Sequence, residues 1–274
     1  MTGNISLVTG ASGFIASHVV QQLLEKGEQV HATVRSIKNK KKIKNLLDMQ
    51  KRWPGKLTLF EADLLAASSF DTPMKGCSVV YHIASPFFIE NKIRDGQKEV
   101  VEPALKGTQH VLEAVQKNET VKIVILTSII HYPPSISTQL VGGQLFLGVP
   151  DMWFAIVDVR EVATAHIQAA QLPDSHGRYI LADGKTRGFV ELARILRSIT
   201  QSSRIPKNTV PNALVRLSGP LLGLSQKWLK LNLSIPFDID NRPSLEQLKI
   251  VYRPLEETLA DHYRSWKSAQ SLAH

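Results

Sequence analysis

Residues 5–27, ISLVTGASGFIASHVVQQLLEKG, join a short apolar run to an amphipathic one through a glycine-rich turn. The run ISLVTG is apolar and rich in β-formers, and it predicts a buried strand. In the second run, apolar residues recur at helical spacing until Gly27, which predicts a helix that ends there. Gly10 and Gly13 lie in the turn, and Ala16 takes the third small position. The stretch therefore predicts a strand, a tight turn and a helix.

Strand-like and helix-like runs continue to alternate beyond this unit. The expected strands are EQVHATVR, LTLFEADL, SVVYHIAS and VKIVILTS, and the expected helices cover residues 39–52 and 101–118. This alternation favours an α/β fold with a doubly wound parallel sheet of the Rossmann type. We expect residues 1–170 to form a dinucleotide-binding domain. Residues 171–274, with GRYILAD as a strand and FVELARILRSIT as an amphipathic helix, are expected to complete the sheet and form a small, mostly helical substrate lobe.

The composition limits the class of protein and its location. The 274 residues are 43% hydrophobic and 21% charged, which is ordinary globular usage. The single cysteine, Cys77, excludes a disulfide framework, and the start of the sequence lacks the pattern of a signal peptide, so we expect a cytoplasmic protein. Residues 123–150 carry no Asp, Glu, Lys or Arg, but they contain too much Pro, Gly, Ser and Thr to predict a membrane helix.

Two segments could suggest a nucleic-acid site or a membrane helix, but each is better explained in another way. The net charge is +9, and much of it lies in residues 35–44, RSIKNKKKIK. A basic run without interleaved aromatic residues is more typical of a solvated helix face or a phosphate contact than of a nucleic-acid site. Residues 213–229 could form an interfacial membrane helix, but Gly219 and Pro220 interrupt it, which favours packing in the substrate lobe. We therefore expect neither nucleic acid nor a membrane as a partner.

The glycine turn predicts a nucleotide site, with a plain structural turn as the alternative. A turn that ends a strand and opens a helix offers free N–H groups and a helix dipole to a pyrophosphate. Gly10 permits the tight turn, and Gly13 lets the backbone approach the phosphates. Arg35 ends the second strand, where a carboxylate would bind a free ribose 2′-hydroxyl. A guanidinium pairs instead with a 2′-phosphate, and Lys42 could add a second positive charge, so the sequence predicts NADP.

The whole predicted cofactor-binding set lies in this turn and at the carboxyl ends of the expected strands. It comprises Gly10, Ser12, Gly13, Phe14, Ile15, Arg35, Lys42, Asp63, Leu64, Ala84, Ser85 and Thr127. Asp63 and Leu64 could flank the adenine, although a turn or capping role for Asp63 is equally open. Ala84 and Ser85 are expected beside the pyrophosphate and ribose. The histidines show no metal-ligand spacing, so no metal site is expected.

Several motifs, taken in their order, resemble those of the extended short-chain dehydrogenase/reductases of the NAD-dependent epimerase/dehydratase superfamily. They are TGASGFIA, TVRS, EADLL, VVYHIASPF, VILTS, IVDVREVATAHIQAA, GRYILA and YRPLEETLADHY. The branch that they resemble holds dihydroflavonol 4-reductase, cinnamoyl-CoA reductase and related NADPH-dependent reductases of aldehydes and ketones. The resemblance implies NADPH as cofactor and a small carbonyl compound as substrate, and it leaves the oligomeric state open.

The resemblance also implies which residues should carry the chemistry. In the family, a tyrosine hydroxyl protonates the substrate carbonyl oxygen, and a lysine four residues later lowers the pKa of that tyrosine and holds the ribose. A serine hydrogen-bonds the same oxygen. The family strand usually ends in Thr-Ser-Ser with the second serine catalytic, whereas this chain has Thr127, Ser128 and Ile129. Ser128 is therefore the candidate catalytic serine.

The expected tyrosine and lysine are missing from the segment that should hold them. Tyr132 is followed by Pro133 and Pro134, which prevent the helix that would present a lysine on the same face. The sequence PPSIS resembles a loop that in the family follows the next strand. We interpret residues 129–134 as the point at which the catalytic helix and the following strand have been deleted. This deletion would leave the sheet incomplete after the fifth strand. A βαβ unit takes about 30 residues or more, so the loss is sizeable.

Three hypotheses follow for function. The first is an NADP(H)-dependent carbonyl reductase by family, impaired or inactive in this chain. The second is a noncatalytic NADP-binding or interaction protein, and the third is a nonfunctional product of a skipped exon or faulty gene model. Tyr263 has Lys267 four residues on, but both lie in the last expected helix, and this common pairing is interpreted as a chance match.

Overall fold

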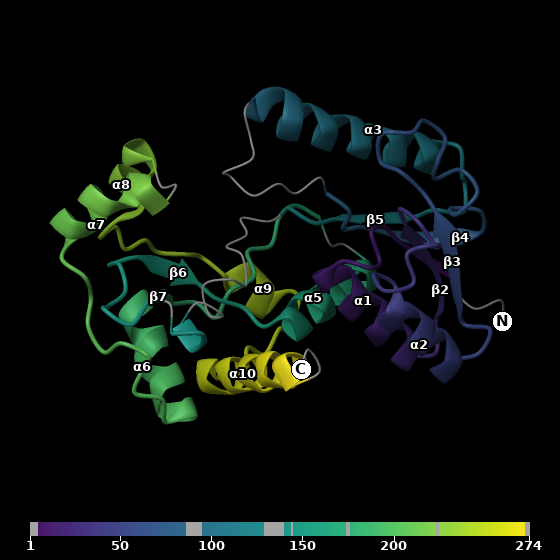
Figure 1. The fold of residues 1–274 in the computed structure, drawn as a ribbon. Helices are drawn as coiled ribbons and strands as arrows, with labels where there is room; N and C mark the ends of the chain where they lie inside the picture. Colours follow the sequence, from purple (N-terminus) through teal and green to yellow (C-terminus); the bar gives the residue numbers. More distant parts are fainter. Residues whose placement is uncertain are drawn as a thin grey trace. The chain divides into compact units, whose positions relative to one another are not determined.

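The structure, a computed structural model, describes residues 5–85, 95–128, 140–143, 145–173, 176–222 and 225–271 (Figure 1). The chain forms two compact units. Unit 1 comprises Met1–Ile129 and Val159–Gly177, and unit 2 comprises Ile130–Asp158 and Arg178–His274. The chain thus passes between the units three times, and the single boundary after residue 170 stays a prediction.

Unit 1 is built on a parallel five-stranded sheet. Its strands are β1 (Ile5–Val8), β2 (Gln29–Val34), β3 (Leu57–Glu61), β4 (Cys77–His82) and β5 (Ile123–Leu126). The spatial order is β3-β2-β1-β4-β5, and every neighbouring pair is parallel. The predicted doubly wound parallel sheet is confirmed. The strand order reverses at β1, so the crevice at the carboxyl ends of β1 and β4 is where a sheet of this topology binds ligands.

Helices cover both faces of this sheet (Figure 1). One face carries α1 (Phe14–Glu25), α2 (Lys44–Arg52) and α5 (Val159–Gln171), and the other carries α3 (Glu102–Gln116), which follows a π-helical turn, η2 (Gln97–Val101). Val8 and Tyr81 enter the first core and Leu7 and Val80 the second, as the two-residue period of a strand requires. Because apolar side chains pack on both faces, the strands read as nearly continuous apolar runs.

The helix expected over residues 39–52 begins later, at Lys44. The Asn39 side chain accepts a hydrogen bond from the Lys42 backbone N–H at 3.2 Å and stabilises a turn over residues 40–43. Asparagine commonly initiates turns in this way. The basic run is therefore a turn followed by a helix.

Unit 2 is a small, mostly helical unit with its own core. Its elements are β6 (Trp153–Ala155), β7 (Thr186–Gly188), α6 (Phe189–Thr200), α7 (Asn212–Ser218), the 3₁₀ turn η3 (Gly219–Leu222), α8 (Gln226–Asn232), α9 (Arg242–Glu246) and α10 (Leu255–Ser271). Leu196, Ile205 and Leu229 are fully buried in its core. The amphipathic helix expected for FVELARILRSIT is confirmed by α6.

The strand expected for GRYILAD, residues 177–183, is wrong. These residues have no regular secondary structure, although the Asp183 N–H donates to the Ile156 carbonyl at 3.1 Å. The expected completion of the parallel sheet is also not found among the described residues of 171–274, where β7 pairs antiparallel with β6. A segment becomes a strand only by pairing with a neighbouring strand, and within the described part of the chain residues 177–183 pair with none.

Strand β5 is an edge of the parallel sheet. Within the described part of the chain no strand pairs with its outer side, and Leu126 at its end is 57% exposed. An unpaired apolar edge is a template for pairing with another chain. None of the described helices is long and apolar enough to cross a membrane.

We expect the purified protein to self-associate through β5 and to be marginally stable. Leu126→Lys should raise the monomer fraction in sedimentation velocity, because an edge lysine opposes strand pairing, and should change the melting temperature little. Leu65→Lys is the matched control, since Leu65 is 56% exposed in unit 1 but lies outside the sheet. A monomeric wild-type protein with a sharp, reversible melt would contradict this expectation.

Candidate functional site

The predicted site residues gather at one edge of unit 1. Gly10, Arg35, Asp63, Ala84 and Thr127 follow β1, β2, β3, β4 and β5 respectively. Since the carboxyl ends of parallel strands meet at the same edge of a sheet, residues far apart in sequence reach one crevice. Most of the remaining predicted residues follow these positions closely in the chain, and they are Ser12, Gly13, Phe14, Ile15, Leu64, Ser85 and Ser128. Lys42 lies seven residues after Arg35, in the turn before α2.

The turn between β1 and α1 has the geometry of a phosphate cradle. Gly10 has φ +65°, and a Cβ atom there would lie 2.9 Å from Ala84 Cβ, so only glycine fits. Gly13, the N-cap of α1, donates its N–H to the Gly10 carbonyl at 2.8 Å. No side chain caps this helix end, which leaves first-turn N–H groups available to an anion. The residues present therefore fit a dinucleotide pyrophosphate.

Hydrogen bonds hold this turn to the strands on either side. On the β2 side, Ala11 N–H donates to the Thr33 carbonyl at 2.8 Å and Gly10 N–H to Thr33 Oγ1 at 3.3 Å. On the β4 side, Thr9 Oγ1 accepts the N–H groups of Ile83 and Ala84, both at 3.0 Å. The loop after β1 is thus fixed to its two neighbours before any ligand binds.

Thr9 also determines the protonation of the buried His82. Its oxygen already accepts two N–H groups, so its hydroxyl proton is the one that bonds His82 Nδ1, at 2.9 Å. The other ring nitrogen faces Thr108 Oγ1 at 3.5 Å, and the Thr108 hydroxyl donates to the Ala104 carbonyl at 2.9 Å. The neutral tautomer with its proton on Nε2 fits both partners. Burial lowers the pKa of His82 to about 4.

A second buried histidine holds the end of β5. His166 Nδ1 faces the Val162 carbonyl at 2.7 Å, so that nitrogen carries the proton. Its Nε2 then accepts from the Thr127 hydroxyl at 2.6 Å. Burial lowers the pKa of His166. With Thr127 N–H donating to the His82 carbonyl at 3.0 Å, Thr127 is fixed between both histidines, and the adjacent Ser128 is exposed.

The end of β2 presents unneutralised positive charge. Arg35 and Lys42 are exposed, and neither forms an ion pair with any residue in the described ranges. The nearby Glu61 carboxylate is used differently, because its Oε1 accepts the Ile37 N–H at 2.7 Å and holds the loop after Arg35. The guanidinium therefore remains available to an anion.

Residues after β3 have local structural roles. Asp63 Oδ1 accepts the Leu65 N–H at 2.9 Å, and the Asp63 N–H donates to Ser69 Oγ at 2.8 Å. This is the turn role that the sequence left open. Leu64 packs against Gly107 of α3, where an added Cβ would lie 3.0 Å from Leu64 Cβ. None of these contacts tests the predicted packing of Asp63 and Leu64 beside the adenine, which stays a prediction.

The one described tyrosine of unit 1, Tyr81, is not a proton donor for a substrate at Ser128. Tyr81 is 2% exposed and packed in the core, and its burial raises its pKa. Tyr179, Tyr252 and Tyr263 belong to unit 2, where Tyr263 stacks on Trp266 at a ring-centroid distance of 6.2 Å. Tyr132 lies outside the described residues. Ser128 is thus placed at the end of β5 without a tyrosine assigned to act with it.

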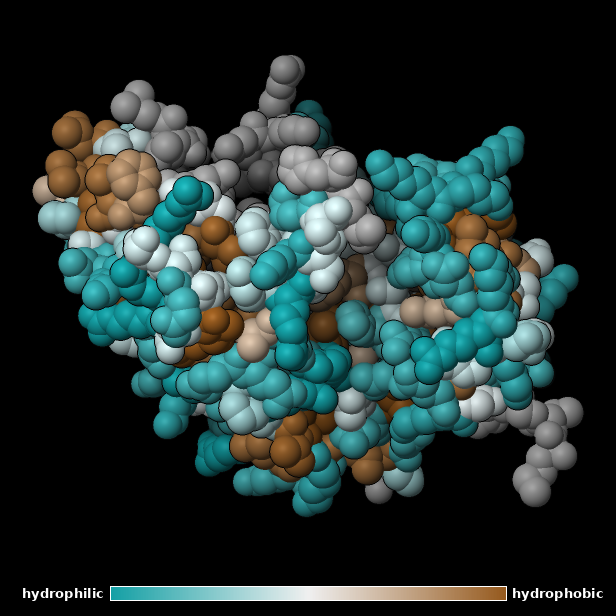
Figure 2. Space-filling model, turned by 60° about the horizontal axis from the view of Figure 1, so that its bottom comes forward, coloured by the Kyte–Doolittle hydropathy of each residue, from teal (hydrophilic) through white to brown (hydrophobic). Residues whose placement is uncertain are grey.

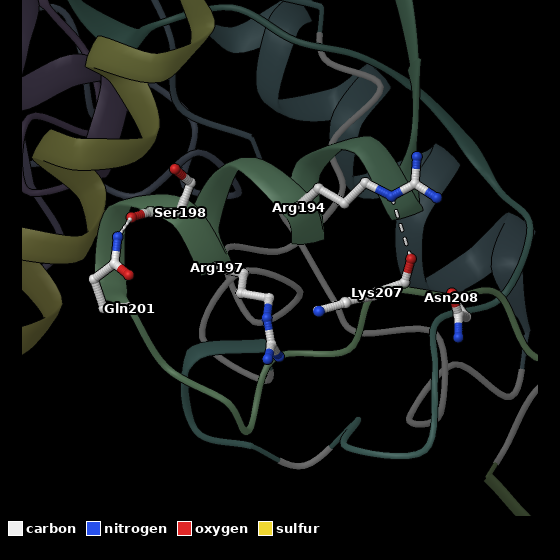
Figure 3. Close-up of a pocket in the computed structure, with 6 residues that line it drawn as sticks. All are labelled: Arg194, Arg197, Ser198, Gln201, Lys207 and Asn208. Atoms are coloured by element: carbon white, nitrogen blue, oxygen red, sulfur yellow. Dashed lines mark hydrogen bonds between the residues drawn. The ribbon is translucent and has the colours of Figure 1, made fainter.

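Unit 2 contains a separate basic hollow of about 500 Å³ (Figure 3). Its lining residues are Arg194, Arg197, Ser198, Gln201, Lys207 and Asn208. The Lys207 ammonium extends toward Arg197, while the Arg194 guanidinium points away and its Nε–H donates to the Lys207 carbonyl at 3.2 Å. None of the predicted site residues lines this hollow.

Sequence reasoning missed the residues that support the site, namely Thr9, Thr33, Glu61, His82 and His166. Two of them had a usable signal, because Thr9 directly precedes Gly10 and Thr33 lies two places before Arg35. The contact of Thr127 with His166 spans 39 positions, and nothing in the local pattern of either residue indicates the other.

We expect the protein to lose stability as the pH falls from about 6.5 to about 4. In the unfolded chain His82 takes up a proton near its usual pKa of 6.5, whereas in the folded chain it does so only near 4, so acid favours unfolding. The full shift corresponds to about 3 kcal/mol. Urea unfolding of His82→Asn should show a shallower loss across this range, with some slope remaining from His166. His176→Asn, at an exposed position, is the control, and identical slopes for all three proteins would contradict this role for His82.

Comparisons with known proteins find related sequences and similar folds. The family model described as GDP-mannose 4,6 dehydratase matches residues 7–129. A cinnamoyl-CoA reductase from Medicago truncatula is 30% identical over 322 aligned positions, which cover 90% of this chain and 96% of the relative. Because 90% of 274 residues is about 247, about 75 of those positions have no counterpart in this chain.

Other matches are either shorter or more distant. A bifunctional dihydroflavonol 4-reductase/flavanone 4-reductase from Pyrus communis is 48% identical over 121 residues. These residues span 44% of this chain and 34% of the relative. The crystal structure of yeast methylglyoxal/isovaleraldehyde reductase Gre2 complexed with NADPH superposes with a TM-score of 0.74 at 19% identity, covering 97% of this chain and 99% of that chain. At that identity the likeness shows the fold.

The cinnamoyl-CoA reductase match extends over nearly the whole of both chains, and the five-stranded sheet carries its glycine turn at the switch point. The chain therefore belongs to the extended short-chain dehydrogenase/reductase family, in the branch that holds cinnamoyl-CoA reductase and dihydroflavonol 4-reductase.

Proposed function

We propose that this chain binds NADP(H) at the carboxyl edge of its parallel sheet and is a carbonyl reductase by descent with impaired turnover. The observation that best supports cofactor binding is the turn after β1, in which Gly10 packs on Ala84 and Gly13 leaves the start of α1 uncapped. The relatives named above are reductases, and one solved neighbour was crystallised with NADPH.

The residues assigned to the cofactor divide by the part of NADP that they would hold. The backbone from Gly10 through Ser12 and Gly13 to Phe14 and Ile15 would bind the pyrophosphate. Arg35 and Lys42 would bind the 2′-phosphate, because charge-assisted hydrogen bonds to phosphate are the strongest available at this edge. The remaining assigned residues would line the adenine and the two riboses, and they are Asp63, Leu64, Ala84, Ser85 and Thr127.

The reaction in which the family uses this site needs more than the cofactor. When bound, NADPH supplies a hydride to a carbonyl carbon. Ser128 would donate a hydrogen bond to the carbonyl oxygen, but that oxygen must also gain a proton as its negative charge develops. No described tyrosine of unit 1 can give that proton, and the lysine that lowers the pKa of such a tyrosine is also unassigned. Aldehyde or ketone reduction should therefore be slow.

The missing aligned positions support the interpretation of an excision. The relative has about 75 positions that this chain lacks, more than the roughly 30 residues of one βαβ unit. The family-model match also stops at residue 129, where the sequence begins to depart from the family pattern. The total number of unmatched positions is large enough for a catalytic helix together with its following strand.

A noncatalytic NADP-binding or interaction protein is the second candidate, and it fits a site in which no described tyrosine of unit 1 is assigned to act with Ser128. A nonfunctional product of exon skipping or of a faulty gene model is the third. Sequencing the encoding DNA around the codon for Ile129 separates the third from the others, because intact coding sequence for the missing unit would be found there.

Arg35 should give the chain a preference for NADPH over NADH. A lost charge-assisted pair costs about 1.5–3 kcal/mol, so Arg35→Glu should weaken NADPH binding by about 10-fold or more and leave NADH binding nearly unchanged. Titration by cofactor fluorescence measures both dissociation constants. Arg178→Glu, an exposed charge reversal in unit 2, controls for net charge. An unchanged NADPH/NADH ratio in Arg35→Glu would show that the assignment of Arg35 is wrong.

Turnover should be far below that of an intact relative even where NADPH binds. General acid catalysis contributes about 10²–10⁴-fold, and the lost lysine adds a positioning penalty. NADPH oxidation with a panel of aldehydes and ketones measures this. Inserting the serine–tyrosine–lysine segment of a relative after Thr127 should restore activity. If the unmodified chain already turns over at about 1–10³ per second, its proton donor lies elsewhere and the proposed impairment is wrong.

A further inference from the structure

Helices α7 and α8 of unit 2 present aliphatic side chains to solvent. Leu214 and Leu217 on α7 are 55% and 77% exposed, and Leu231 on α8 is 63% exposed. In Figure 2 apolar surface gathers over these helices, brown at the upper left. Single exposed leucines need no explanation, but three on two adjoining short helices form a local apolar surface.

The interruption of this segment keeps the leucines outward. Gly219 and Pro220 end α7 and begin the 3₁₀ turn η3, so the segment forms two short α-helices instead of one continuous helix. Gln226 Nε2–H donates to the Arg216 carbonyl at 2.6 Å and joins the start of α8 to the end of α7. Val215 and Leu229 fill the core of unit 2 on the inner side. The glycine and proline that disfavour one continuous interfacial helix therefore produce two short helices with a shared outer surface.

Basic side chains lie on the same two helices as these leucines, and the carboxylate of Asp151, near the start of α7 and the end of α8, accepts the Ser234 hydroxyl at 2.6 Å. Arg216, Lys227 and Lys230 are exposed, and Lys227, Lys230 and Leu231 share one side of α8 because they lie at positions i, i+3 and i+4. The whole stretch 192–237 contains no Asp or Glu. Its seven basic residues are Arg194, Arg197, Arg204, Lys207, Arg216, Lys227 and Lys230, three of which line the hollow in Figure 3.

We propose that the α7–α8 patch, defined as Leu214, Arg216, Leu217, Lys227, Lys230 and Leu231, binds the surface of an anionic lipid bilayer. Aliphatic side chains enter the headgroup boundary while lysine and arginine bind anionic headgroups, so each half of the patch has a partner there. This contact with one face of a membrane needs no helix that crosses it, and it departs from the sequence-based expectation that no membrane is a partner. It is independent of the proposed cofactor site.

Two other occupants fit the patch less well. A second copy of the chain would bring this patch against its own basic residues, and like charges facing each other oppose a symmetric contact. Single-stranded nucleic acid is bound by basic grooves with exposed aromatic rings, whereas the one aromatic residue in 212–232, Trp228, is half-buried. The charge complementarity and the aliphatic residues together select the anionic bilayer.

Cosedimentation with vesicles tests the proposal on the full chain. We expect binding to vesicles of phosphatidylcholine with phosphatidylserine, little binding to phosphatidylcholine alone, and weakening as salt screens the charges. The double variant Leu214→Ser/Leu217→Ser and the triple variant Arg216→Gln/Lys227→Gln/Lys230→Gln should each reduce the bound fraction, by about fivefold or more at low salt. Circular dichroism confirms that these surface variants fold.

Matched controls separate this patch from general stickiness. Leu105→Ser/Leu112→Ser removes two exposed leucines from α3, and Lys38→Gln/Lys40→Gln/Lys41→Gln removes three charges from the basic run of unit 1. Both should bind vesicles as the unchanged chain does. The proposal is overturned if the chain does not sediment with anionic vesicles, or if the control variants lose as much binding as the patch variants. It is also overturned if the patch substitutions change only oligomeric state, or only the affinity for single-stranded DNA.

Discussion

The contact between Gly10 and Ala84 determines how unit 1 is arranged at its functional edge. A Cβ atom at residue 10 would lie within 3.0 Å of two Ala84 atoms, so the chain can turn away from β1 only if that position has no side chain. The Thr9 hydroxyl holds the other side of the contact, because it accepts the N–H groups of Ile83 and Ala84. The uncapped helix end at Gly13 depends on this close approach of two loops.

Buried neutral histidines extend that constraint across the sheet. His82 accepts a hydrogen bond from the Thr9 hydroxyl, and His166 accepts one from the Thr127 hydroxyl, so each histidine fixes a threonine at the end of a strand. An unpaired buried imidazole would be costly, whereas each of these has a partner at both nitrogens. The cofactor half of the family fold is thus internally supported, although the tyrosine and lysine of the chemical step are unassigned. Under the proposed excision, the scaffold that binds NADP in the family would remain even though the reacting groups are lost.

Whether a feature of the fold or of the site could be predicted depends on how far apart in the sequence the interacting residues lie. The turn at Gly10, the arginine after β2 and the helix at Phe189–Thr200 follow from neighbouring residues and from periodicity, and the sequence indicates all three. The strand expected for GRYILAD failed because a strand also needs an edge to pair with, and composition carries no information about that edge. The pairs Thr9–His82 and Thr127–His166 bring together residues 73 and 39 positions apart, so only the folded sheet reveals them. Likewise, the segment containing Gly219 and Pro220 shows the break in helical periodicity, but the outward direction of Leu214 and Leu217 depends on how unit 2 folds.

The three passages of the chain between the units have a consequence for synthesis. Helix α5, which covers one face of the parallel sheet, comes from residues 159–171, after the chain has already entered unit 2. During translation the five strands can pair once β5 has emerged, but the face that packs on Ala163, Ile167 and Ala170 stays open until α5 follows. At about 5–20 residues per second this takes several seconds, a period in which a nascent sheet exposes an apolar face together with the edge at β5. Chaperone demand for this chain is therefore set by the order in which its parts leave the ribosome, as well as by the stability of the finished fold.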